Sequence, residues 1–308
     1  QLDPTTGIDL GPLSFLLRPN GTASDSRTSS GSTVPANSVS FESPGQVLFS
    51  IDGAGALIGG IGSGSATAQT TLLPPGHPGF GQPEAIATQT VTDLKLYYRP
   101  SLLSSEGMSV QNISSTSKVE SSTTLGIKAT ATTTLSGIRI WGTHDYDSAP
   151  GYVGVIKIDS ITITAVAQSD GLLATSTLNW QWVNFRIWDP AALAYKKYDG
   201  TPDAPSTCTY SASGSTAPNP PCATTISIPA AYGVPAPGET YQNCSACSLA
   251  IVVGTSHVLT SPDGQLAQSS QRGLLTFYFK NQGLRPLETT IFTLGSATAE
   301  VTYRQHGH

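Results

Sequence analysis

Charged side chains are scarce in this 308-residue chain. They make up 11% of it, against a usual share of about 25%. The basic residues are scattered, and only Lys196 and Lys197 place two cations side by side. Neutralising the phosphates of a nucleic acid requires clustered Lys and Arg, so we expect no nucleic-acid partner. No apolar run approaches the roughly 20 residues of a membrane-spanning helix, so we expect no membrane span.

The chain also lacks the motifs of common enzymes and cofactor sites. It has no G-x-G-x-x-G, P-loop or calcium-loop pattern, and "GIGSG" (60–64) misses the G-x-S-x-G nucleophile pattern because Gly62 stands at its centre. We therefore expect no catalytic residues, no metal and no cofactor. One cluster offers a start for a hydrolase, His144 with Asp145 and Asp147, but a polar turn explains it more simply.

Hydroxyl residues take the place of the missing charges. The chain contains 38 Ser and 38 Thr, while hydrophobic residues make up 38%. Such a surface stays soluble through hydroxyl groups or through attached sugars. The first residue is Gln1 rather than Met, which favours a mature chain released from a signal peptide. We predict a secreted protein of the extracellular space, the cell surface or an extracellular fibre.

Four cysteines lie in the C-terminal part of the chain: Cys208, Cys222, Cys244 and Cys247. The single C-x2-C spacing lacks the second pair typical of structural zinc, and the βαβ context of a redox motif is missing. We predict two disulfides and hence an oxidising compartment. Local pairing would join Cys208 to Cys222, but four cysteines allow three pairings and the sequence does not choose among them.

Three sequons fit N-x-[ST], at Asn20, Asn112 and Asn243. They are candidates for N-glycosylation in a secreted protein. Because Ser and Thr are so frequent here, about two such sequons would arise by chance. The sequence therefore permits attached glycans without demonstrating them.

Nearly every regular segment has the composition of a β-strand, with Val, Ile, Thr and aromatic residues between clusters of Gly, Pro, Asn, Asp and Ser. Many short strands without a repeat predict an all-β fold, an antiparallel β-sandwich or a jelly-roll-like domain. The predicted strands are 46–52, 90–98, 136–141, 153–167, 176–188, 248–254, 274–279 and 299–304.

Three long segments look irregular: an N-terminal arm (1–45), a Gly/Pro-rich excursion (59–88) and a Pro/Ser/Cys excursion (199–247). Loops longer than about 15 residues are uncommon in compact domains and are usually functional or disordered. We therefore divide the chain into the arm and a β-sandwich domain over 46–308, which has room for two packed sub-domains.

Residues 176–190 contain the most distinctive strand. Trp180 and Trp182 share one face, whereas Val183 belongs to the other, so the pattern predicts a β-bulge or burial on both sides. A core strand explains the tryptophans best, and a sugar-stacking platform of Trp180, Trp182 and Trp188 is the functional alternative. The following residues, 189–200, are the only candidate helix, with Pro190 near its start.

The arm contains an apolar segment of strand length, 7–19, followed by a linker of low hydrophobicity, 20–40. A strand on a long tether can complete the sheet of a neighbouring subunit, whereas an edge strand of the same domain needs no long tether. The two halves of the segment have opposite parity, and Gly11-Pro12 separates them. The candidate anchors are Ile8, Leu10, Leu13, Phe15 and Leu17.

These observations favour a structural protein over an enzyme. We predict a secreted, glycosylated homo-oligomer that forms a filament or surface layer by strand exchange. The first alternative is a carbohydrate-binding module or adhesin that uses the tryptophan strand, and the second is a hydrolase.

Overall fold

A computed structural model describes twelve segments of the chain, and every element in them is a β-strand. These segments are 8–9, 37–50, 57–71, 84–98, 108–122, 126–140, 156–189, 194–197, 207–219, 225–229, 248–281 and 288–303. All strand pairs in them are antiparallel, which confirms the predicted all-β class and is consistent with a β-sandwich.

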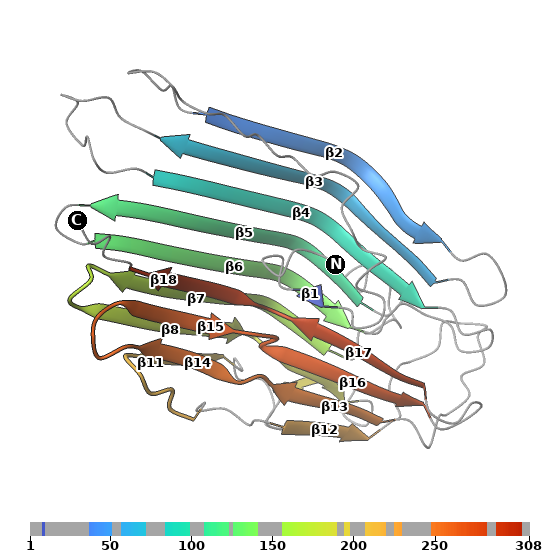
Figure 1. The fold of residues 1–308 in the computed structure, drawn as a ribbon. Helices are drawn as coiled ribbons and strands as arrows, with labels where there is room; N and C mark the ends of the chain where they lie inside the picture. Colours follow the sequence, from blue (N-terminus) through green and yellow to red (C-terminus); the bar gives the residue numbers. More distant parts are fainter. Residues whose placement is uncertain are drawn as a thin grey trace, which may run out of the picture.

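The largest sheet has ten strands and forms the long layer in Figure 1. Six long strands follow one another as a meander, and four shorter ones complete the sheet. The long strands are β2 (Asn37–Ser50), β3 (Leu57–Thr71), β4 (Glu84–Tyr98), β5 (Met108–Ser122), β6 (Gly126–Ile140) and β7 (Ile156–Ser169). The short strands are β8 (Ala174–Val183), β9 (Arg186–Asp189), β10 (Ala194–Lys197) and β11 (Cys208–Ser213).

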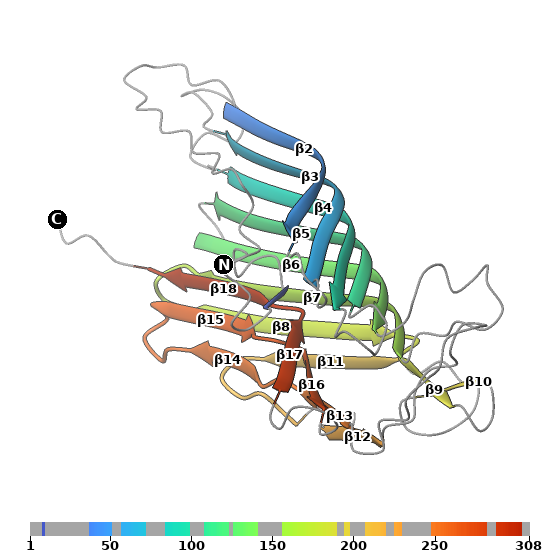
Figure 2. The same ribbon diagram turned by 90° about the vertical axis from the view of Figure 1, so that its right-hand side faces the viewer.

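Two smaller sheets form the second layer (Figure 2). One consists of β14 (Ser256–Thr260), β15 (Leu266–Gln271) and β18 (Ala297–Thr302). The other has the order β1 (Ile8–Asp9), β17 (Glu288–Leu294), β16 (Leu275–Asn281), β13 (Ser248–Val253) and β12 (Thr225–Pro229).

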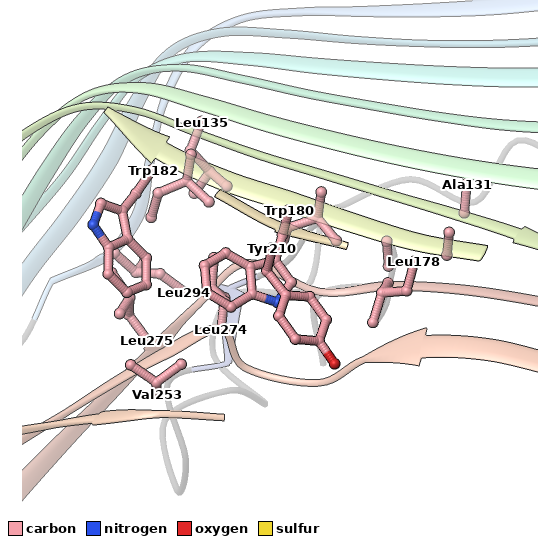
Figure 3. Packing of buried hydrophobic residues seen from close by; sticks show 14 of the residues in the cluster. Ala131, Leu135, Leu178, Trp180, Trp182, Tyr210, Val253, Leu274, Leu275 and Leu294 are labelled. Atoms are coloured by element: carbon pink, nitrogen blue, oxygen red, sulfur yellow. The ribbon is translucent and has the colours of Figure 1, made fainter. Parts of the chain in front are cut away.

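The core lies where the three-stranded sheet covers the large one. β18 packs on β6 and β7, β15 on β7 and β8, and β14 on β8 and β11. The inward residues of β7 and β8 alternate with outward ones, so that Ile161, Ile163, Trp180 and Trp182 are all at most 1% exposed. Figure 3 shows the tryptophans facing Leu274, Leu275 and Leu294 across the core.

A bend crosses the large sheet at one level. Asp93 in β4, Gly137 in β6 and Asn184 after β8 have φ values of 50°, 63° and 54°. Positive φ changes which face the following side chains occupy: in β6 the buried positions are odd up to Leu135 and even from Ile138. The bend therefore turns several neighbouring strands together.

The irregularity predicted after Trp182 belongs to this bend. Ser160 pairs with Val183 and Lys157 with Arg186, so each side has two residues between the pairs and no residue is inserted. β8 is buried on one face only. The break is thus neither a bulge nor two-sided burial; it follows from the positive φ of Asn184.

Two predictions of local structure are wrong. The candidate helix 189–200 includes the hairpin strand β10, in which Tyr195 pairs with Trp188 and the Lys157 ammonium lies 4.9 Å from the Tyr195 ring centroid. Cross-strand contacts outweigh the helix propensity of its alanines. The Gly/Pro-rich excursion 59–88 contains most of β3 and the start of β4, because pairing with β2 and β5 extends both strands.

The ordered sheet also begins earlier than predicted. β2 starts at Asn37, inside the predicted arm and linker, and the Pro/Ser/Cys excursion contains β11 and β12. All eight predicted strands coincide with or overlap strands of the structure.

Candidate functional site

Of the five predicted anchor residues of the assembly strand, only Ile8 is described. Ile8–Asp9 forms the edge strand β1 beside β17 of the same chain, with Ile8 opposite Leu294 and Asp9 opposite Thr293. Leu10, Leu13, Phe15 and Leu17 lie outside the described residues. The pairing identifies β17 as a strand edge that accepts the start of the arm.

The two central tryptophans lie in the core rather than on a surface. Trp180 and Trp182 are 1% and 0% exposed, and their rings stack at 5.1 Å between centroids. Trp180 also stacks on Tyr210 at 5.0 Å, and its Nε1 donates a hydrogen bond to Ser256 Oγ at 3.2 Å. A sugar cannot stack on rings buried in this way, so their burial favours the core interpretation. Trp188 lies in β9.

Of the four predicted disulfide cysteines, the structure describes only one. Cys208 is buried in β11 and disulfide-bonded, but Cys222, Cys244 and Cys247 lie outside the described residues, so the pairing stays a prediction.

Asn112 is exposed in the middle of β5, whereas Asn20 and Asn243 lie outside the described residues. His144, Asp145 and Asp147 also lie outside the described residues. Within the described part, no three metal-ligating side chains gather at one place, and no helix has the length and hydropathy to span a membrane.

The outer face of the large sheet carries the most regular arrangement of polar side chains. Strand register aligns the outward residues of β3 to β7 into three rows, which we call the hydroxyl array. The first row is Thr67, Thr88, Thr116, Thr132 and Thr164; the second is Ser65, Thr90, Ser114, Thr134 and Thr162; the third is Ser63, Thr92, Asn112, Ser136 and Ser160.

Contacts within the rows order the hydroxyl groups. Ser63 Oγ lies 2.7 Å from Thr92 Oγ1, and Ser65 Oγ lies 2.5 Å from Thr90 Oγ1. No residue of the hydroxyl array is buried. Such cross-strand pairs each stabilise a sheet by about 0.2–1 kcal/mol and support flat sheets of many strands.

Charged groups appear at the borders of the hydroxyl array. At one end Lys118 and Lys128 contact Glu120, with N–O distances of 2.6 and 3.1 Å. These hydrogen bonds lower the pKa of the Glu120 carboxyl, so the group is ionised at neutral pH. At the other end, Asp159 accepts a hydrogen bond from Asn184 at the bend. The array itself is neutral and contains no aromatic residue.

The hydroxyl array is not apparent from the sequence alone. The alternating Thr130, Thr132 and Thr134 of β6 are visible in the sequence, but the rows depend on the register of five strands, which no single segment reveals.

Comparison with known proteins gives no relatives: no protein family, no curated protein and no solved structure matches the chain.

Proposed function

We propose that this protein is a structural subunit that assembles with copies of itself outside the cell, by addition of its N-terminal arm to a neighbour. The observation that carries the proposal is the pairing of β1 with the edge of β17. An arm that pairs with an edge strand in its own chain can pair with the same edge strand in another copy, through the same contacts.

The edge of β17 is longer than the part that β1 covers. β17 has seven residues, and β1 pairs with only two of them, Thr293 and Leu294. Continuing this antiparallel register on an exchanged arm would place Leu10 opposite Phe292 and Ser14 opposite Glu288. Residues 10–14 of the exchanged strand would therefore pair with the rest of β17, and the anchors Phe15 and Leu17 would extend beyond it.

A second edge supports association of the same kind. β2 has 14 residues and is the outermost of the long strands, and among the described strands it pairs with β3 alone, on one side. Unpaired N–H and C=O groups along such an edge favour pairing with another chain. The predicted exchanged strand, 7–19, precedes β2 in the chain, so one copy presents both a donor segment and long edges.

Electron microscopy and light scattering test the proposed assembly. We expect the full-length protein to form regular fibres or layers, and a variant lacking residues 1–19 to remain small. Assembly that is unchanged by the deletion would overturn the strand-exchange mechanism, and a full-length protein that stays monomeric would overturn the structural function.

Cross-linking separates exchange from folding back. Asp9→Cys and Thr293→Cys are placed in different chains, which are mixed before assembly, because these two residues face each other across the β1–β17 pair. Exchange predicts a disulfide-linked pair of chains. As a matched control, Thr298→Cys, an exposed position in β18, replaces Thr293→Cys and should give no cross-link. Cross-links at the control level would show that each arm stays on its own chain.

A further inference from the structure

The hydroxyl array has a two-dimensional repeat fixed by the sheet. Neighbouring strands lie about 4.7–4.9 Å apart, and outward residues recur every two positions, at about 6.4–6.8 Å along a strand. Figure 1 shows β3 to β7 running side by side over the length of the array. Their side chains therefore form a rectangular lattice of hydroxyl groups, with the amide of Asn112 at one point.

The chemistry of the array narrows the kind of partner. A phosphate-bearing or mineral surface needs charged ligands, and the rows contain none. Carbohydrate surfaces are usually bound through exposed aromatic rings, and the tryptophans of β8 are buried. Neutral groups that both donate and accept hydrogen bonds suit a partner made of the same groups at a regular spacing.

We propose that the hydroxyl array binds the surface of ice. Hexagonal ice presents oxygen atoms on its prism planes in a rectangular repeat of similar dimensions. A single Thr hydroxyl gains little binding free energy by exchanging liquid water for ice. Many hydroxyls held rigidly in register can together give a substantial binding free energy, because they are already ordered in the sheet and lose little conformational entropy on binding.

Two features of the array agree with this partner. The first row has Thr at all five positions and so combines a methyl group with each hydroxyl, which allows ordered water to be held both by hydrogen bonds and by apolar contact. The contacts between Ser63 and Thr92 and between Thr132 and Thr164, at 2.7 and 3.4 Å, fix side chains across neighbouring strands. The array is thus ordered before it meets its partner.

The proposal requires that the hydroxyl array be accessible, and therefore that Asn112 carry no glycan. This sequon lies in the third row, and a glycan there would cover its neighbours. The protein should therefore carry no sugar at Asn112, which mass spectrometry of material from the native source checks. Complete occupancy of Asn112 would overturn the proposal.

Partition into slowly growing ice is the direct test. The full-length protein, made in a host without N-glycosylation, should be enriched in the ice fraction relative to an added control protein. Thr116→Tyr with Thr132→Tyr should reduce the enrichment at least tenfold, because two rings would stand above the first row. Tyrosine suits strands, so the fold should persist, as circular dichroism and thermal unfolding would verify.

A matched substitution controls for surface changes in general. Thr298→Tyr alters an exposed Thr of β18, outside the array, and should leave the enrichment unchanged. Exclusion of the unaltered protein from ice, or equal enrichment of the double variant, would overturn the proposal. Binding to crystalline cellulose or chitin in place of ice would assign the face to a polysaccharide instead. None of these results depends on assembly, because a chain lacking residues 1–19 retains the array.

Discussion

The inner face of the large sheet has two parts: a covered part, where the three-stranded sheet packs on β6, β7, β8 and β11, and an extended part, formed by β2 to β5. The burial of inward side chains differs between them, although the same rows of paired residues cross both. One row starts with Trp180 and Ile163 in β8 and β7 and continues through Thr133 and Ser115 to Gln89 in β4. Trp180, Ile163 and Thr133 are at most 1% exposed, Ser115 is 6% exposed, and Gln89 is half-buried. The side chains thus change from apolar to polar, and become less buried, as the row leaves the covering sheet.

The extended part shows the same gradient along a strand. In β4, Leu94 near the bend is 3% exposed, Val91 is half-buried, and Ala87 and Ala85 are exposed. Val119 of β5, opposite Ala85, is 46% exposed. Away from the bend, backbone pairing extends the sheet with little apolar burial, and among the described side chains buried apolar residues reach β5 and β4 only at Val110, Ile113 and Leu94. Sheet width and core size are therefore separate properties of this fold.

The largest effect is expected for Trp180→Ala. The change removes a buried ring that stacks on Trp182 and Tyr210, and it leaves the Ser256 hydroxyl without its donor. We expect a loss of about 3–5 kcal/mol in the free energy of unfolding, measured by chemical denaturation. Gln89→Ala, in the same row of the extended part, should cost less than about 1 kcal/mol. Equal losses would remove the distinction between the two parts.

Gly137→Ala tests how much close packing at the bend adds to the cost of its backbone conformation. Gly137 has a φ of 63°, and an added Cβ would lie 2.4 Å from Gln111 Oε1. We expect a cost of about 1–3 kcal/mol from backbone strain and the displaced Gln111 side chain. Gly214→Ala is the matched control, because its φ is 79° but an added Cβ would meet nothing within 4 Å. A loss no greater than the control's would assign the effect to backbone conformation alone.

Sequence patterns predicted the covered part well and the extended part poorly. The alternating apolar residues of β7 identify a strand buried on one face, because burial requires that period. β3 has the sequence LIGGIGSGSATAQTT, and its glycines and serines are typical of a loop; its strand conformation comes from β2 and β4 on either side. The hydroxyl array could not be predicted for a related reason: the register between strands determines which hydroxyl residues lie side by side.

Thr133→Val compares the two faces of one strand. Thr133 points inward, is 1% exposed, and donates a hydrogen bond of 2.7 Å to the Ser296 carbonyl in the second layer. Valine keeps the shape but leaves that carbonyl without its donor, so we expect a loss of about 1–2 kcal/mol in thermal or chemical unfolding. Thr132→Val, the adjacent outward change, should stay within about 0.5 kcal/mol. A larger effect at Thr132 would show that the contact between Thr132 and Thr164 in the outer row contributes more to stability than an ordinary surface pair.

The smallest effect is expected at the charged border of the hydroxyl array. Hydrogen bonds from Lys118 and Lys128 lower the pKa of Glu120 on folding. A lowered folded pKa means that the ionised group stabilises the fold above the unfolded pKa, and that this contribution disappears as the pH falls through the folded pKa. Because the group is a third exposed, we expect Glu120→Gln to cost only about 0.2–1 kcal/mol at neutral pH. The difference from the unaltered protein should vanish in acid and shrink in high salt. A cost that persists in acid would mean that Glu120 stabilises the fold through packing rather than through its charge, as the buried residues of the covered part do.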